Sequence, residues 1–285
     1  MNLKVAIQGI LGAFHEEAAI TYYKTEAIEL VQCKTFSELT ENVAKGIADT
    51  GIIAIENTIA GSILPNYDLI KESGLFITGE IYMRIIQNLI AKEGVKIEAV
   101  KDVLSHPMAI YQCSEFFKKY PHIRLTESFD TAISVKEIAE NGFKDKAAIA
   151  SSFAAKRYNL KILAESIETN KLNYTRFFEI KSKSDVNQSN INKSTVNFSL
   201  SHKTGSLASV LSVFAFYEMN LQKIQSYPVI GTPDKYSFYV DLIFDDFMRY
   251  KQSINAVIPL TINFKVLGEY KRAEKSFNKI HKSQS

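Results

Sequence analysis

Hydrophobic positions follow two spacings along the first part of the chain, up to about residue 181. Short apolar runs, such as residues 4–9 and 51–55, have the length and continuity of buried strands. The segments between such runs carry apolar residues at helical spacing, as between Phe36 and Ile47. This alternation of strands and helices predicts an α/β fold.

A long extended stretch, residues 75–90, exceeds the length of one ordinary strand. We interpret it as a crossing from one lobe to another, with the chain returning near residue 159. Lobe one is then expected at about 1–78 and 159–181, and lobe two at about 79–158. Two α/β lobes joined by two crossing segments form a hinged cleft, and ligands commonly bind between such lobes.

A different pattern follows the polar segment 182–193. This segment is rich in Ser, Asn and Lys, and is therefore predicted to be a linker. From residue 194 to residue 268 the pattern predicts strand, helix, strand, strand, helix and strand. That order is typical of the ferredoxin-like βαββαβ unit. The remaining residues, 269–285, are predicted to form a solvated basic tail.

Composition and charge limit the functional classes. With 46% hydrophobic and 23% charged residues, the chain can bury a core and is not disordered. A net charge of +3 is too small to indicate a nucleic-acid partner. Cys33 and Cys113 lie far apart without metal-ligand spacing, as expected of buried thiols in a reducing compartment. No signal peptide or membrane-spanning segment is recognisable, so we expect a soluble cytoplasmic protein.

Residues 173–177, in the sequence Asn-Tyr-Thr-Arg-Phe, are the main candidates for chemistry. The surrounding alternation has period two and predicts a strand. The Thr175 hydroxyl can donate a hydrogen bond or a proton, and the Arg176 guanidinium can hold a carboxylate with two parallel hydrogen bonds. Taken alone, the segment also fits an edge strand with one surface arginine.

Neutral hydrogen-bond donors follow the apolar strand at residues 51–55. Asn57, Thr58 and Ser62 lie where ligands bind in open α/β sheets, and they could hold a carboxylate. The same Ser62 could instead cap the helix that follows it. The sequence leaves both roles open.

Other strand ends also carry polar residues. Residues 9–14 join a strand to a helix through a glycine turn, a weak signal for an anion site. Ser105 and His106 follow a third strand, and Asp130 is placed to cap the helix that begins at Thr131. A single histidine in such a position is more often structural than catalytic.

Together these segments resemble monofunctional prephenate dehydratases with a C-terminal ACT regulatory domain, over residues 4 to 268. The matching stretches are 9–14, 56–58 with Gly61, 105–107, 130–132 and 173–177. The resemblance implies that the first 181 residues have the two-lobed fold of type II periplasmic binding proteins. It also implies that the enzyme makes phenylpyruvate for phenylalanine synthesis.

The resemblance assigns roles to individual residues. Thr175 corresponds to the essential threonine of the family, with Arg176 and Phe177 completing the catalytic motif. Residues that the resemblance or their position places at the substrate are Asn57, Thr58, Gly61, Ser62, Ser105 and Thr131. Loss of carbon dioxide and water makes the substrate ring aromatic, so we expect neither a metal nor a cofactor.

The resemblance also implies regulation. In the family, phenylalanine binds between paired ACT domains, so we expect a homo-oligomer, a tetramer formed as a dimer of dimers. The second effector motif departs from the usual Glu-Ser-Arg-Pro and reads Gln-Ser-Tyr-Pro at 225–228. The expected phenylalanine site consists of Gly205, Ser206, Leu207, Gln225 and Ser226.

Three departures in the catalytic part leave the polar contacts with the substrate open. Ala13 and His15 stand where the family often has Thr and Ser, and Gln87 stands near a usual histidine. Two other functions remain as alternatives, an arogenate dehydratase and a non-catalytic amino-acid sensor built as a binding-protein clamp. The hydroxyl of Thr175 favours an enzyme, because a clamp has no need of it beside the arginine.

Overall fold

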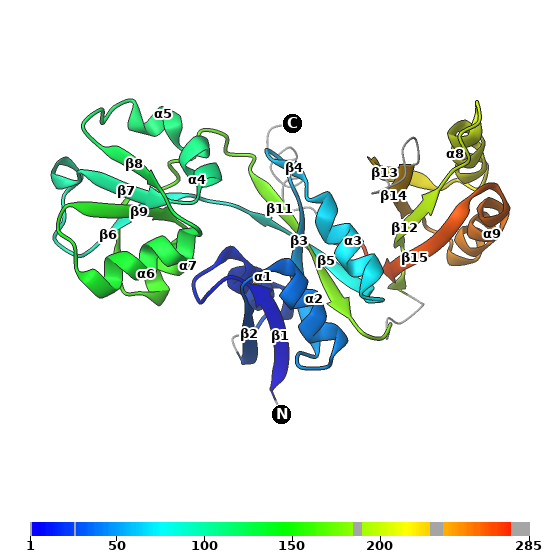
Figure 1. Ribbon diagram of the computed structural model, residues 1–285, viewed down its shortest axis with the longest axis horizontal. Helices are drawn as coiled ribbons and strands as arrows, with labels where there is room; N and C mark the ends of the chain where they lie inside the picture. Colours follow the sequence, from blue (N-terminus) through cyan, green and yellow to red (C-terminus); the bar gives the residue numbers. More distant parts are fainter. Residues whose placement is uncertain (1, 26, 185–189, 229–235, 275–285) are drawn as a thin grey trace.

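The computed structural model describes residues 2–25, 27–184, 190–228 and 236–274, and arranges them in two lobes and a further unit (Figure 1). Its described strands form one sheet of ten strands and one of five. The ten-stranded sheet runs through lobe one and continues into the further unit. The five-stranded sheet belongs to lobe two.

Lobe one is built from the first strands of the chain and from one strand that returns late. Its strands are β1 (Leu3–Gln8), β2 (Ile28–Cys33), β3 (Thr50–Asn57), β4 (Gly61–Ser62), β5 (Phe76–Arg84) and β11 (Tyr174–Lys181). Its helices are α1 (Phe14–Tyr23), α2 (Phe36–Ala44) and α3 (Leu64–Glu72). Strand β3 is parallel to β1, and β11 lies antiparallel between β3 and β5. The continuous apolar sequence of β3 reflects burial on both faces.

Lobe two has its own sheet and helices. Its strands are β6 (Asn88–Ala91), β7 (Asp102–Ser105), β8 (Arg124–Glu127), β9 (Lys146–Ala150) and β10 (Lys161–Ala164), in the order β10-β6-β9-β7-β8. Its helices are η1 (Ile97–Ala99), α4 (Pro107–Gln112), α5 (Ser114–Phe117), α6 (Thr131–Asn141) and α7 (Ser152–Arg157). Asp130 caps α6 as predicted, accepting the amide of Ala132 over 2.7 Å. Cys113 is buried here and Cys33 is buried in lobe one, both as free thiols.

The predicted ferredoxin-like unit is confirmed. It consists of β12 (Lys193–Ser199), α8 (Ser206–Phe216), β13 (Asn220–Pro228), β14 (Tyr236–Ile243), α9 (Phe247–Val257), η3 (Ile258–Leu260) and β15 (Ile262–Tyr270). The strand order is β13-β14-β12-β15, with antiparallel neighbours. Side chains from α8 and α9 pack with one face of this sheet in a separate core.

The other face of this sheet packs against lobe one. Tyr239 and Tyr270 join the lobe-one core beside Tyr67 and Phe178. Strand β15 also meets β5 at Gly268, where an added Cβ atom would lie 2.2 Å from the carbonyl oxygen of Ile77. Only glycine permits this approach. It joins the strands of lobe one and of the ferredoxin-like unit into the single ten-stranded sheet.

The expected α/β class is confirmed, and the chain crosses to lobe two within the extended stretch 75–90, as expected. Strand β5 stays in lobe one as far as Arg84, β6 begins at Asn88, and β10 pairs with β6 in lobe two. The expected lobe boundary at residue 79 is therefore too early, and the expected return near residue 159 is wrong. Lobe two spans β6 to β10, because an extended sequence does not reveal which sheet each half of it joins.

The boundaries of the ferredoxin-like unit also need correction. Lys193 was expected in the linker, yet it is fully buried in β12 with its ammonium group on Glu80. Tyr270 was expected in the tail, yet it is fully buried at the end of β15. Residues 185–189 of the expected linker and 275–285 of the expected tail lie outside the described residues.

Candidate active site

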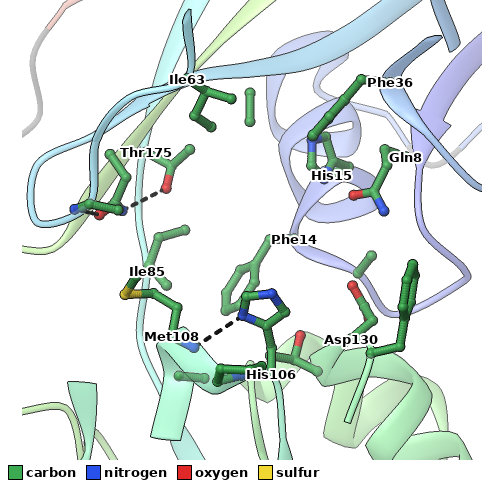
Figure 2. Close-up of a pocket in the computed structure, with 18 of the residues that line it drawn as sticks. Gln8, Phe14, His15, Phe36, Ile63, Ile85, His106, Met108, Asp130 and Thr175 are labelled. Atoms are coloured by element: carbon green, nitrogen blue, oxygen red, sulfur yellow. Dashed lines mark hydrogen bonds between the residues drawn. The ribbon is translucent and has the colours of Figure 1, made fainter. Parts of the chain in front are cut away.

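A cavity of about 740 Å³ lies between the two lobes (Figure 2). Lobe one contributes the ends of β1 and β3 and the first turn of α1, and lobe two contributes the starts of α4 and α6. Its polar and charged lining residues include Gln8, His15, Lys34, Asn57, Gln87, His106, Gln112, Asp130, Thr131 and Thr175. The cavity therefore lies at strand ends, where open α/β sheets bind ligands.

Thr175 is held in the cavity wall by Asn57. Thr175 in β11 pairs with Asn57 in β3, and both side chains reach the cavity. Asn57 Nδ2 donates to Thr175 Oγ1 over 3.0 Å, while Asn57 Oδ1 accepts the amides of Ile59 and Ala60. These contacts fix the orientation of the Asn57 amide. Because Thr175 accepts this hydrogen bond, its own hydroxyl proton can be donated into the cavity.

Phe177 lies two residues along β11 and also faces the cavity. Its ring packs edge-on against His15, with centroids 5.1 Å apart. Phe14, Phe36 and other apolar side chains complete this part of the wall. This apolar surface suits a flat carbocyclic ring.

Two buried polar atoms of the wall have no hydrogen-bond partner among the described residues, His15 Nε2 and Gln87 Oε1. Burial lowers the pKa of His15 to about 4, so its imidazole is neutral at pH 7. An unsatisfied buried polar group costs about 1–3 kcal/mol, which a bound polar ligand can offset. His15 and Gln87, singled out by sequence only as departures, are thus candidate ligand contacts. Ala13, the third departure, lines the same cavity.

Fixed charges are few in this cavity. Lys34 is the one lysine or arginine among the described lining residues, and it is exposed. Asp130 supplies a carboxylate from lobe two, and it lies across the cavity from Thr175 in Figure 2. Its Oδ1 is engaged in capping α6, whereas its Oδ2 lies toward Gly9 of lobe one. The sequence analysis did not single out Lys34. It identified Asp130 as a helix cap and as part of the matching stretch 130–132, without a role at the ligand.

Arg176 does not face the cavity. As the next residue after Thr175, it leaves the opposite face of the sheet, toward the ferredoxin-like unit. Its guanidinium donates to Glu80 over 2.8 Å, to Tyr270 Oη over 3.1 Å and to Asp241, and the residue is 2% exposed. The interpretation of Arg176 as a ligand for a substrate carboxylate is therefore wrong. It is a buried link between lobe one and the ferredoxin-like unit.

The charges around Arg176 compensate one another. Glu80 also accepts two hydrogen bonds from Lys193, at 2.8 and 2.9 Å. Burial alone would raise the pKa of Asp241, but Arg176 and Lys193 outweigh it and hold that pKa below its ordinary value. Two cations and two carboxylates thus share one buried site, as buried charges must to remain ionised.

Of the six residues predicted to bind substrate, Asn57 and Thr131 line the cavity. The remaining four do not. Thr58 donates to the carbonyl of Leu172 over 2.8 Å, so it fastens the chain segment before β11. Ser105 is fully buried and donates to the carbonyl of Ile149 over 2.7 Å.

Ser62 and Gly61 belong to the small β4 strand instead. Gly61 pairs with Asn57, and Ser62 pairs with Glu56. The Ser62 hydroxyl accepts a hydrogen bond from Lys223 over 2.7 Å, away from the cavity. Nor does Ser62 cap α3, which follows Ile63 without a side-chain cap. Both expectations for Ser62 were wrong because a helix start was read where a hairpin strand intervenes.

The expected effector residues fall into two groups. Ser206 and Leu207 line a pocket of about 440 Å³ at the start of α8, directly after Gly205. Ser226 pairs with Phe238, which lines the same pocket. Gln225 pairs with Tyr239, whose ring packs against Tyr67 of lobe one. Within a single chain, Gln225 therefore faces lobe one and not this pocket.

The described residues contain no group of three or more His, Cys, Asp or Glu side chains placed to hold a metal ion. In the same part of the chain, no helix is long and apolar enough to cross a membrane.

Residues 5–185 match the family model described as "Prephenate dehydratase". One curated relative is "Arogenate dehydratase/prephenate dehydratase 2, chloroplastic" from Arabidopsis thaliana. It is 36% identical over 282 residues, which cover 94% of this chain and 73% of the relative. The similarity therefore reaches beyond the cavity and through the ferredoxin-like unit.

Solved structures share the whole arrangement. The prephenate dehydratase from Staphylococcus aureus subsp. aureus Mu50 has a TM-score of 0.81 and 26% identity, covering 94% of this chain and all of that one. A prephenate dehydratase in complex with L-Phe, from Arthrobacter aurescens, has a TM-score of 0.86 at 24% identity. That alignment covers 99% of this chain and 98% of the other, and at this identity it shows the fold alone.

Removing the Arg176 charge should destabilise the junction between lobe one and the ferredoxin-like unit. Arg176→Gln leaves Glu80 and Asp241 buried with one cation fewer, and we expect a loss of about 3–5 kcal/mol in the free energy of unfolding. Arg176→Lys should be intermediate, because it keeps the charge and loses the fork. Urea denaturation measures both. As a control, Arg249→Gln breaks an exposed pair with Glu218 and should cost less than about 1 kcal/mol. Equal losses in Arg176→Gln and Arg249→Gln would contradict the network.

The buried His15 should make stability depend on pH. Its folded-state pKa is about 4 and its ordinary value 6.5, so the unfolded chain binds more protons between these values. Stability should therefore rise with pH from 4 to 6.5, by up to about 1.4 kcal/mol per pH unit. Unfolding free energies across this range should lose that slope in His15→Asn and keep it in His122→Asn, a change at an exposed histidine. An unchanged slope in His15→Asn would rule out His15 as its source.

Proposed function

The chain belongs to the prephenate dehydratase family, whose members are lyases of phenylalanine biosynthesis, and on this premise we propose that its cavity converts prephenate to phenylpyruvate. One observation carries the proposal. A threonine hydroxyl, oriented by Asn57, faces an aromatic-walled cavity between two lobes. The matched family model, over residues 5–185, includes all the residues that line this cavity.

The reaction needs a hydrogen-bond donor at the leaving oxygen. Prephenate carries a carboxylate and a hydroxyl across its cyclohexadiene ring. As the carboxylate leaves as carbon dioxide, its bonding electrons move into the ring and expel hydroxide, which takes a proton from solvent and leaves as water. Thr175 donates to that oxygen as charge develops on it. A threonine hydroxyl is a weak acid, so it polarises the breaking bond and does not transfer its proton fully.

The remaining side chains orient the substrate. The ring stacks against the surface formed by Phe14, Phe36 and Phe177, which excludes water and so strengthens the hydrogen bond from Thr175. The neutral imidazole of His15 and the carboxamide of Gln87 bind the polar side chain of the substrate and thereby satisfy their own buried atoms. Lys34 pairs with a carboxylate at the mouth of the cavity.

Arogenate is a second candidate substrate, and Asp130 favours it. Prephenate carries two negative charges, and arogenate differs by an ammonium group in place of the side-chain keto group. A carboxylate in the wall opposes a dianion and attracts an ammonium group. Lys34 is the one lysine or arginine among the described lining residues. It offsets Asp130 in the net charge of the lining, but it does not neutralise the carboxylate itself. The named activities of the Arabidopsis relative include both substrates.

We also propose that phenylalanine regulates the enzyme through the ferredoxin-like unit, as an ACT domain. The support is the pocket beside Ser206 and Leu207, together with the L-Phe complex of a protein of the same fold. Assembly into a homotetramer would let a second ACT domain complete this site. A cytoplasmic location likewise stays a prediction, consistent with two free buried cysteines.

Incubation of the purified protein with prephenate and, separately, with arogenate tests the proposed function. Phenylpyruvate or phenylalanine should form, respectively, and chromatography distinguishes them. If neither product forms, the non-catalytic amino-acid sensor becomes the better explanation of the fold.

Thr175 should act mainly in the transition state. Thr175→Val keeps the volume and removes the donor, so we expect kcat to fall on the order of 10²-fold with KM nearly unchanged. Steady-state kinetics on the better substrate measure this, and Thr175→Ala should agree. Thr21→Val, at an exposed position of α1, serves as the control and should keep wild-type turnover. Normal turnover in Thr175→Val would remove this hydroxyl from the mechanism.

Asp130 should set the preference between the two substrates. Asp130→Asn keeps a capping side chain for α6 and removes the charge. We expect kcat/KM for prephenate relative to arogenate to rise about tenfold, which corresponds to about 1.4 kcal/mol. Asp246→Asn is the matched control, because Asp246 caps α9 in the same way far from the cavity. An unchanged ratio in Asp130→Asn would show that Asp130 only caps its helix.

A further inference from the structure

Neighbouring residue pairs of β3 and β11 face opposite sides of the sheet. Thr175 pairs with Asn57, and this pair faces the cavity. Arg176 pairs with Glu56, and this pair faces the ACT domain. The segments of β3 and β11 that hold the Thr175 hydroxyl in the cavity therefore also contact the regulatory domain on the other side of the sheet.

Lys223 of β13 reaches across to this second pair. Its ammonium group lies 3.1 Å from Glu56 Oε2 and 2.7 Å from Ser62 Oγ, and its side chain is 9% exposed. Glu56 and Ser62 pair with each other across the β3–β4 hairpin. One side chain of the ACT domain thus holds both strands of a hairpin in lobe one.

Asn57 is the last residue of β3, directly before the turn of this hairpin. Residues 58 and 60 of the turn and Gly61 of β4 are exposed, and the amides of Ile59 and Ala60 are bound to Asn57 Oδ1. The same side chain orients Thr175 through Nδ2. A displacement of the hairpin therefore moves Asn57 and changes the orientation of the Thr175 hydroxyl.

The junction has both a need for its ion pair and room to rearrange. Burial lowers the pKa of Lys223 and Glu56 opposes this, so the ammonium group depends on the carboxylate beside it. A small cavity of about 140 Å³ borders Lys223, Glu56 and Gln222. Gln222 Oε1 is buried and has no partner among the described residues. The side chains of Lys223 and Gln222 therefore have space beside them in which to change position.

We propose that Lys223 is a positioning residue for the reaction and the contact through which the ACT domain acts on Thr175. Lys223 lies two residues from Gln225 of the expected effector site, on the same face of β13. A ligand that moves β13 withdraws the ammonium group from Glu56 and Ser62 and releases the hairpin. The catalytic part of this inference rests on the proposed function.

Lys223→Met tests the positioning role, because methionine keeps an unbranched side chain and removes the charge. We expect kcat to fall about tenfold, within the range typical of coupled sites, and KM to change much less. Lys223→Arg should restore most of the turnover. Lys251→Met is the matched control, since Lys251 pairs with Glu269 inside the ACT domain, and it should behave as wild type. Equal losses in Lys223→Met and Lys251→Met, or wild-type kcat in Lys223→Met, would overturn the proposal.

Phenylalanine tests the coupling in the same variants. Calorimetry should show that Lys223→Met still binds phenylalanine, while its residual activity is inhibited far less than that of wild type. Undiminished inhibition in Lys223→Met would show that the effector acts through another contact.

Hydrogen exchange tests the contact without relying on activity. The amides of Ile59 and Ala60 should exchange faster in Lys223→Met than in wild type and in Lys251→Met. If the wild-type protein converts neither prephenate nor arogenate, the proposed function fails, and the exchange rates still decide whether Lys223 holds the hairpin. Equal rates in all three proteins would refute that contact.

Discussion

The antiparallel pairing of β11 with β3 is the interaction on which the site and its regulation both depend. Because successive residues of a strand face opposite sides, Thr175 enters the cavity and Arg176 enters the junction with the ACT domain. A register shift follows, where Phe177 pairs with Ala54 and Ile55 is left over. This irregularity lets both Asn57 and Ala54 reach the cavity although they are three residues apart.

The buried charges behind the sheet determine how the ACT domain sits on lobe one. An unpaired charge in that interior would cost several kcal/mol. Arg176, Lys193, Glu80 and Asp241 avoid this cost because they meet there as ion pairs. A guanidinium that must meet Glu80 from lobe one and Asp241 from the ACT domain does not permit the two units to slide past each other. The network therefore favours one docked arrangement, and small movements of the ACT domain are felt at β11.

Much of the fold could be predicted because local patterns dictate it. The apolar run of β3 and the strand and helix order after residue 193 identified both halves of the molecule. The site was predicted only in part. Thr175, Phe177, Asn57 and Thr131 do line the cavity. Period-two alternation says that Arg176 and Thr175 face opposite sides, but it does not say which side holds the ligand.

The two faces of one sheet differ in their electrostatics: the neutral donor Thr175 faces the cavity, and the paired charges of Arg176 face the junction. The reaction expels an oxygen that becomes negative only as the bond breaks, so a neutral donor such as Thr175 gains strength during the step. A fixed cation in its place would bind the carboxylates of the substrate before the reaction as strongly as it binds the transition state. It would therefore stabilise the ground state as well and would not lower the barrier between them. The paired charges of Arg176 therefore lie behind the sheet, where they hold the position of β11 without competing for substrate. A neutral His15 in front of the sheet follows the same logic. Control of the reaction then requires only a change in where Thr175 points, which a contact through the sheet can supply.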